Sequence, residues 1–151
     1  MPQSARKVLL AYVDAQRSGS VEDVLATIAD DAVFDVGRGR YDGRAAIRAF
    51  HERLRRIHST THVVRVDERG PGEVVAEFDQ RDDDLGPLGI DAIRLNVTVH
   101  VGPDGRIVRF TARPTPESLA RIAAARDAGR TSEGVTAAER AGNLPRSSHE
   151  S

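Results

Sequence analysis

One carboxylate, Asp35, interrupts an otherwise apolar segment at residues 32–36. A carboxylate in a dry pocket has a raised pKa and can remove a proton from the carbon next to a carbonyl group. Successive side chains of a strand point to opposite faces. If Asp35 faces inward with Val33, it is a candidate general base; if it faces outward, Phe34 and Val36 occupy the core instead.

Four further residues could take part in acid–base chemistry. Tyr12 lies on an apolar helical stripe, either as a core tyrosine or as a donor to a substrate oxyanion. His62 opens a predicted strand and is a candidate proton carrier. Glu77 and Asp79 alternate with apolar residues, so they form either a polar outer face or an inward acid pair.

The histidines and the absence of cysteine argue against a metal site. His51, His58, His62 and His100 form no HExxH motif, and the chain contains no cysteine. The sequence therefore predicts neither a metal nor another cofactor.

Composition narrows the class of protein further. A chain of 151 residues fits one domain, and a net charge of −1 argues against a nucleic-acid partner. No apolar run approaches the roughly 20 residues of a membrane span, and the N-terminal pattern is not that of a signal peptide. We therefore expect a cytoplasmic protein that has no membrane partner.

The first third of the chain is predicted to be mainly helical. Apolar residues recur at helical spacing over residues 5–16, and Gly19 ends this helix. Ser20 is predicted to cap a second helix whose buried face extends to Ile28. A glycine-rich loop at residues 37–43 separates the strand of Asp35 from a third helix with an apolar stripe.

Period-two alternation dominates the rest of the domain. It predicts strands at residues 62–66, 74–79, 92–101 and 106–113. A last helix is predicted from Thr115 to about Asp127, ended by Gly129. The polar composition that follows predicts a domain at residues 1–128 and a flexible tail at residues 129–151.

This order of elements resembles the NTF2-like superfamily, and within it the SnoaL-like and ketosteroid-isomerase-like proteins. The segments that carry the resemblance lie at residues 12–50 and 104–107, and the resemblance covers about residues 5–113. It implies an α+β cone, in which a curved antiparallel sheet wraps three N-terminal helices and a C-terminal helix follows. It also implies a small apolar substrate and a homodimer formed through the outer face of the sheet.

The functional positions of the relatives can be carried over individually. The oxyanion-binding tyrosine of ketosteroid isomerases corresponds to Tyr12. Their general base corresponds to Val36, or to Asp35 after a shift of one residue, and their second acid corresponds to Val97.

Limonene-epoxide-hydrolase-like members use an Asp–Arg–Asp set. Its first acid falls near Asp79, its arginine near Glu77 and its last acid on Ala112.

The leading hypothesis is a SnoaL-like isomerase, cyclase or dehydratase that acts on an apolar carbonyl or polyketide-like compound. Asp35 would be its base, Tyr12 its donor and His62 an optional proton carrier. The substrate-binding residues are predicted to be Phe34, Phe50, Leu54, Leu95, Val97, Val99, Phe110 and Ala112. The alternatives are a non-catalytic ligand-binding or dimerisation module, and an epoxide hydrolase or cyclase with Glu77 or Asp79 inside the pocket.

Overall fold

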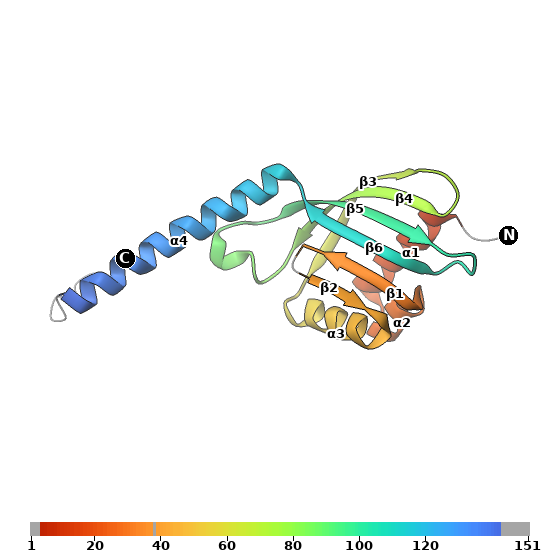
Figure 1. Ribbon diagram of the computed structural model, residues 1–151, viewed down its shortest axis with the longest axis horizontal. Helices are drawn as coiled ribbons and strands as arrows, with labels where there is room; N and C mark the ends of the chain where they lie inside the picture. The colour runs from red at the N-terminus through yellow and green to blue at the C-terminus, as the bar shows by residue number, and fades with distance from the viewer. Residues whose placement is uncertain (1–3, 38, 143–151) are drawn as a thin grey trace.

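The protein folds as an α+β cone in which a mixed, mostly antiparallel sheet packs against N-terminal helices (Figure 1). The computed structural model describes residues 4–37 and 39–142, with side chains described as far as residue 129. The sheet has six strands in the order β2-β1-β6-β5-β4-β3. This confirms the fold class that the sequence predicted.

The first two helices begin and end as their sequences dictate. Helix α1 (Ala5–Ser18) is capped by the Ser4 side chain, and Gly19 follows its last residue. Helix α2 (Val21–Leu25) begins with a capping box in which Ser20 and Asp23 each bond the other's backbone N–H. The helix is shorter than predicted, because Ile28 already belongs to the first strand.

The strand that contains Asp35 is longer than its apolar segment. Strand β1 (Ile28–Val36) pairs antiparallel with β2 (Gly39–Asp42), so most of the predicted glycine-rich loop is a strand. Helix α3 (Gly43–Arg56) then begins at Gly43, whose φ of +84° is a conformation that glycine adopts without strain.

The remaining strands form an antiparallel meander. They are β3 (Thr60–Glu68), β4 (Glu73–Arg81), β5 (Ile93–Val101) and β6 (Ile107–Pro114). A short 3₁₀ helix, η1 (Gly86–Leu88), lies between β4 and β5. Strands β1 and β6 pair in parallel, an exception to the antiparallel sheet that was predicted.

The hydrophobic core lies between the sheet and helices α1 to α3. Val97 and Val99 of β5 are buried, whereas Asn96, the residue before Val97, is exposed on the opposite face. The rings of Phe34 and Phe110 stack with centroids 4.7 Å apart, which joins β1 to β6. Alternation along β5 therefore distinguishes a core face from an outer face, as predicted.

The last helix, α4 (Pro116–Gly142), extends away from the sheet (Figure 1). Its Ile122 packs against a small cluster that contains Leu85, Ile90 and Ile93. The predicted end at Gly129 is wrong, since one glycine costs a helix only about 1 kcal/mol relative to alanine. Residues 143–151 of the predicted tail lie outside the described residues, and the division of the domain from its tail stays a prediction.

Within residues 4–37 and 39–142, no helix is long and apolar enough to cross a membrane.

Candidate functional site

Asp35 lies on the outer face of the sheet. Its neighbour Phe34 is fully buried against Phe110, so alternation along β1 directs Asp35 to the other side. Its carboxylate is 2.9 Å from the guanidinium of Arg113, which also donates to the Asp35 carbonyl. The inward orientation that a general base requires is therefore wrong, and the outward alternative is correct.

The acids of β4 also face outward. Arg94 donates to Asp79 at 2.6 Å and to Glu77 at 3.1 Å, and Glu77 pairs in addition with Arg65. The hydrogen bond from Arg94 lowers the pKa of Asp79 and keeps it ionised. An epoxide hydrolase or cyclase that uses these acids inside the cone is not supported.

His62 is part of the same outer surface. It is exposed and stands opposite Asp79 in the β3–β4 ladder. Tyr12, in contrast, is buried in the core with 1% of its surface exposed. The structure therefore does not bring together the predicted catalytic set of Asp35, Tyr12 and His62.

Instead, Tyr12 is paired with a histidine. Its hydroxyl lies 2.7 Å from Nε2 of His51, a residue of α3 that is 2% exposed. The side-chain amide of Gln16, one turn along α1, donates to the same hydroxyl at 3.1 Å. The rings of Tyr12 and His51 meet edge to face with centroids 5.6 Å apart. These contacts form a buried polar cluster of Tyr12, His51 and Gln16.

The backbone determines which nitrogen of His51 carries the proton. Nδ1 lies 2.8 Å from the carbonyl oxygen of Ile47, which can only accept, so Nδ1 carries the hydrogen. Burial lowers the pKa of His51 to about 4, although the bond to Ile47 acts in the opposite direction. The imidazole is therefore neutral at pH 7, and its Nε2 accepts the proton of Tyr12.

Tyr12 is held neutral as well. Burial raises its pKa above the usual value, while the bond from Gln16 lowers it in part. A neutral tyrosine that faces a neutral histidine combines a proton donor with a proton acceptor, both away from water. Such pairs with perturbed pKa values are concentrated at functional sites.

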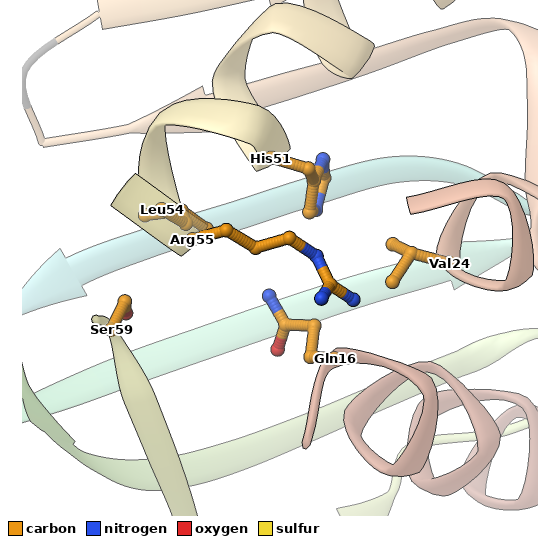
Figure 2. Close-up of a pocket in the computed structure, with 6 residues that line it drawn as sticks. All are labelled: Gln16, Val24, His51, Leu54, Arg55 and Ser59. Atoms are coloured by element: carbon orange, nitrogen blue, oxygen red, sulfur yellow. The ribbon is translucent and has the colours of Figure 1, made fainter. Parts of the chain in front are cut away.

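A small cavity lies beside this cluster (Figure 2). Its volume is about 20 Å³, measured as space for the centre of a water-sized sphere, which is room for about one water molecule. Its lining residues come from α1, α2, α3 and the position just before β3: Gln16, Val24, His51, Leu54, Arg55 and Ser59. Figure 2 shows the Arg55 side chain running between His51 and Gln16.

Most of the predicted substrate-binding residues pack against one another instead. Phe34, Val97, Val99, Phe110 and Ala112 are buried in one core cluster. Phe50 and Leu95 are partly buried against that cluster. Leu54 is the member of the predicted set that lines the cavity beside His51. The cone is thus filled by its own side chains at these positions.

In the described part of the chain, no group of histidine and acidic side chains is arranged to hold a metal ion.

The pairing of His51 with Tyr12 was missed from the sequence, although one signal was available. His51 follows Ile47 by four residues on the apolar stripe of α3, so its burial could have been read from the helical period. His51 and Tyr12 are 39 positions apart in the chain, so no local sequence pattern predicts their contact.

Comparison with known structures identifies proteins that share this fold. SalBIII, an epoxide hydrolase/cyclase-like enzyme of pyran ring formation in the polyether salinomycin, aligns with a TM-score of 0.67 and 16% identity, over 76% of this chain and 92% of that one. A Mycobacterium tuberculosis protein solved with estradiol-17β-hemisuccinate aligns with a TM-score of 0.65 and 20% identity, over 77% of this chain and 98% of that one.

A third similar structure is described as an NTF2-like protein. An NTF2-like protein from Cytophaga hutchinsonii aligns with a TM-score of 0.62 and 15% identity, over 79% of this chain and 96% of that one. At these identities the similarity shows the fold alone. No curated protein matches the sequence.

The sequence itself matches the family model of the SnoaL-like domain over residues 9–112. The match spans more than half of the chain and includes most of α1, all of β1 and α3, and nearly all of the sheet. The chain therefore has the fold of an NTF2-like protein and belongs to the SnoaL-like domain family.

Proposed function

We propose that the chain is a small-molecule enzyme of the isomerase or cyclase type, which acts by acid–base catalysis on an apolar carbonyl compound. The site is the cavity beside His51. The observation that supports it is the buried 2.7 Å hydrogen bond between Tyr12 and His51. It replaces the catalytic role that the sequence gave to Asp35.

The resting hydrogen bond contains both groups that enolisation requires. When a substrate carbonyl oxygen accepts the Tyr12 proton in place of His51, the lone pair of Nε2 becomes free. Nε2 then takes a proton from the carbon next to the carbonyl, which leaves an enolate and an imidazolium. Return of that proton to another carbon of the enolate completes an isomerisation and restores neutral His51.

The lowered pKa of His51 is compatible with this role. A pKa of about 4 describes the site without substrate, where burial opposes the charged ring and the positive charge of Arg55 lowers the pKa further. An enolate beside the ring is an opposite charge, and it favours the imidazolium. Hydrogen bonds from Tyr12 and Gln16 stabilise the enolate oxygen in the manner of an oxyanion hole.

The second candidate is a non-catalytic binding module with the same fold. It is favoured by the small cavity, about 20 Å³, and by the complete pairing of Tyr12 and His51 with each other. It differs from the enzyme in a measurable way, because a binding module leaves the protons of its ligand in place.

The two candidates are separated by deuterium exchange. A panel of apolar cyclic ketones is incubated with the protein in D₂O, and exchange at the carbon next to the carbonyl is followed by NMR. For the enzyme we expect exchange above the buffer rate, reduced by a factor of about 10²–10³ in Tyr12→Phe. We expect a similar loss in His51→Asn, with Asp35→Asn as the matched control that retains full exchange.

Circular dichroism of each variant shows whether a loss of exchange is caused by unfolding. Exchange at the buffer rate with every ketone would contradict the acid–base function and favour the binding module. Exchange that persists in folded His51→Asn would remove His51 from the mechanism.

A further inference from the structure

The cavity beside His51 is too small for the substrates of the proposed function. It has room for about one water molecule, whereas a ketone brings several carbon atoms besides its oxygen. The two reacting groups are themselves buried, with 1% of Tyr12 and 2% of His51 exposed. A substrate can therefore reach the Tyr12–His51 pair only if part of the cavity wall moves.

Arg55 is the part of that wall that faces solvent. Among the lining residues that the structure describes, Arg55 alone is exposed, and the others are buried or partly buried. Figure 2 shows its side chain crossing the cavity from α3, between His51 and Gln16, with the guanidinium towards Val24. A side chain that lines the cavity and also contacts water separates the cavity from the solvent.

Few contacts hold this side chain in place. Its guanidinium donates to the carbonyl oxygen of Gly19, the residue that follows α1. In the described part of the chain Arg55 makes no other hydrogen bond and no ion pair. Exposed side chains change rotamer within nanoseconds, far faster than helices move. Rotation of Arg55 is therefore the smallest movement that removes a part of the wall.

We propose that Arg55 is a movable gate over the Tyr12–His51 pair. When its guanidinium leaves the Gly19 carbonyl and rotates into solvent, the space that it occupied joins the cavity and admits the substrate. The proposal rests on the proposed function, because it takes the cavity beside His51 as the substrate site. It makes Arg55 a residue that controls access and does not itself react.

Opening of the gate also changes the base. The positive charge of Arg55 lowers the pKa of His51, after the larger effect of burial. When the guanidinium rotates away, its distance from the imidazole and the access of water to the ring both increase. Each change favours the imidazolium, so the pKa of His51 rises. His51 is therefore a stronger base in the open state than in the closed one.

Chemical labelling measures access to His51 directly. Diethyl pyrocarbonate acylates neutral imidazole and is much larger than water, so the closed cavity excludes it. Mass spectrometry compares acylation of His51 with that of the exposed His62 in the same sample. If the gate is open for at most about 10% of the time, Arg55→Ala should accelerate acylation of His51 at least about tenfold.

Arg56→Ala is the matched control. Arg56 is the next residue of α3, is exposed and does not line the cavity, so its loss should leave acylation of His51 unchanged. Urea distinguishes the gate from unfolding, because rotation of one side chain exposes little new surface. Acylation of His51 in the wild type should therefore be independent of urea below the unfolding transition. This measurement tests the gate even if Arg55→Ala does not fold.

The outcomes distinguish the gate from the function on which it rests. The gate is overturned by an unchanged rate in folded Arg55→Ala, by equal increases in Arg55→Ala and Arg56→Ala, or by wild-type acylation that rises with urea. The proposed function survives that result if ketones still exchange their protons in a manner that depends on His51. Conversely, acylation that is independent of urea and controlled by Arg55, without proton exchange in any ketone, supports the gate and overturns the acid–base function.

Discussion

Oη of Tyr12 and Nε2 of His51 lie 2.7 Å apart in the core, although 39 positions separate the two residues in the chain. The bond joins α1 to α3, and each partner is otherwise surrounded by aromatic rings, among them Phe34. Because both groups are shielded from water, neither can exchange its partner for a solvent molecule without moving. The bond therefore contributes to the stability of the fold as well as to any chemistry.

Tyr12→Phe should destabilise the protein. The variant leaves Nε2 of His51 buried without a donor, which costs about 1–3 kcal/mol in the free energy of unfolding. Urea denaturation measures the change. Tyr41→Phe is the matched control, since Tyr41 stacks on Phe50 and its hydroxyl has no hydrogen bond among the described residues. Equal losses in the two variants would contradict the prediction.

Stability should fall as the pH decreases from about 6.5 to about 4. The unfolded His51 binds a proton near its ordinary pKa of about 6.5, whereas the folded pKa is about 4. The unfolded state thus holds more protons in this window, so stability is full above pH 6.5 and is lost towards pH 4. The loss is on the order of 3 kcal/mol.

Denaturation at several pH values tests this assignment. His51→Leu should flatten the pH profile of stability between pH 4 and 6.5. An unaltered slope in His51→Leu would show that other groups cause the acid sensitivity.

Asp35→Asn should have little effect on stability and none on deuterium exchange. Asp35 and Arg113 form an ion pair whose side chains are 28% and 48% exposed, and such pairs contribute less than about 1 kcal/mol. Thermal denaturation and the ketone exchange assay measure the two effects. A loss of exchange in a folded variant would restore Asp35 as a catalytic residue.

Assembly through the outer face stays a proposal, and Arg94→Glu tests it. The face carries both signs of charge, with Arg94 between Glu77 and Asp79, and so can be complementary to a second copy. Reversal of the Arg94 charge places like charges together and should shift a dimer towards the monomer in sedimentation. Arg106→Glu makes the same change of charge in the β5–β6 turn and should not. A wild-type monomer at every concentration would rule out the dimer.

Gly129→Ala should stabilise the protein by about 0.5–1 kcal/mol. Gly129 lies within α4, and no atom lies within 4 Å of the position that a Cβ would occupy. Alanine in a helix interior loses less conformational entropy than glycine. A decrease in stability would indicate a conformation that alanine cannot adopt, as at the end of a helix. Denaturation followed by circular dichroism measures the sign of this change in stability.

Local rules predicted the elements of this fold better than their contacts. The capping box of Ser20 and Asp23 and the alternation of β5 depend on neighbouring residues, and both were readable from the sequence. Strand β2 was missed because Gly39 and its neighbours look like a loop until their pairing with β1 is known. The early start of β1 at Ile28 was missed for the same reason, since its partner on β6 is Ile107.

The candidate site was harder to predict than the fold. One residue of register decides whether Asp35 or Phe34 faces the core, and local composition allowed both. Tyr12 was identified, but its partner His51 depends on how α1 and α3 pack on the sheet. Arg55 lies in a cationic last turn of α3, and its sequence context does not distinguish it from arginines that pair with acids.

The parallel pairing of β1 with β6 also governs the order in which the chain can fold. The β1–β2 hairpin is complete at Asp42, yet its neighbour in the sheet ends at Pro114. During synthesis, the edge of β1 that pairs with β6 stays uncovered until most of the domain has been made. Contacts between distant segments slow folding, and an uncovered strand edge can pair with other chains. Nascent chains that stop before β6 should therefore depend most strongly on chaperones.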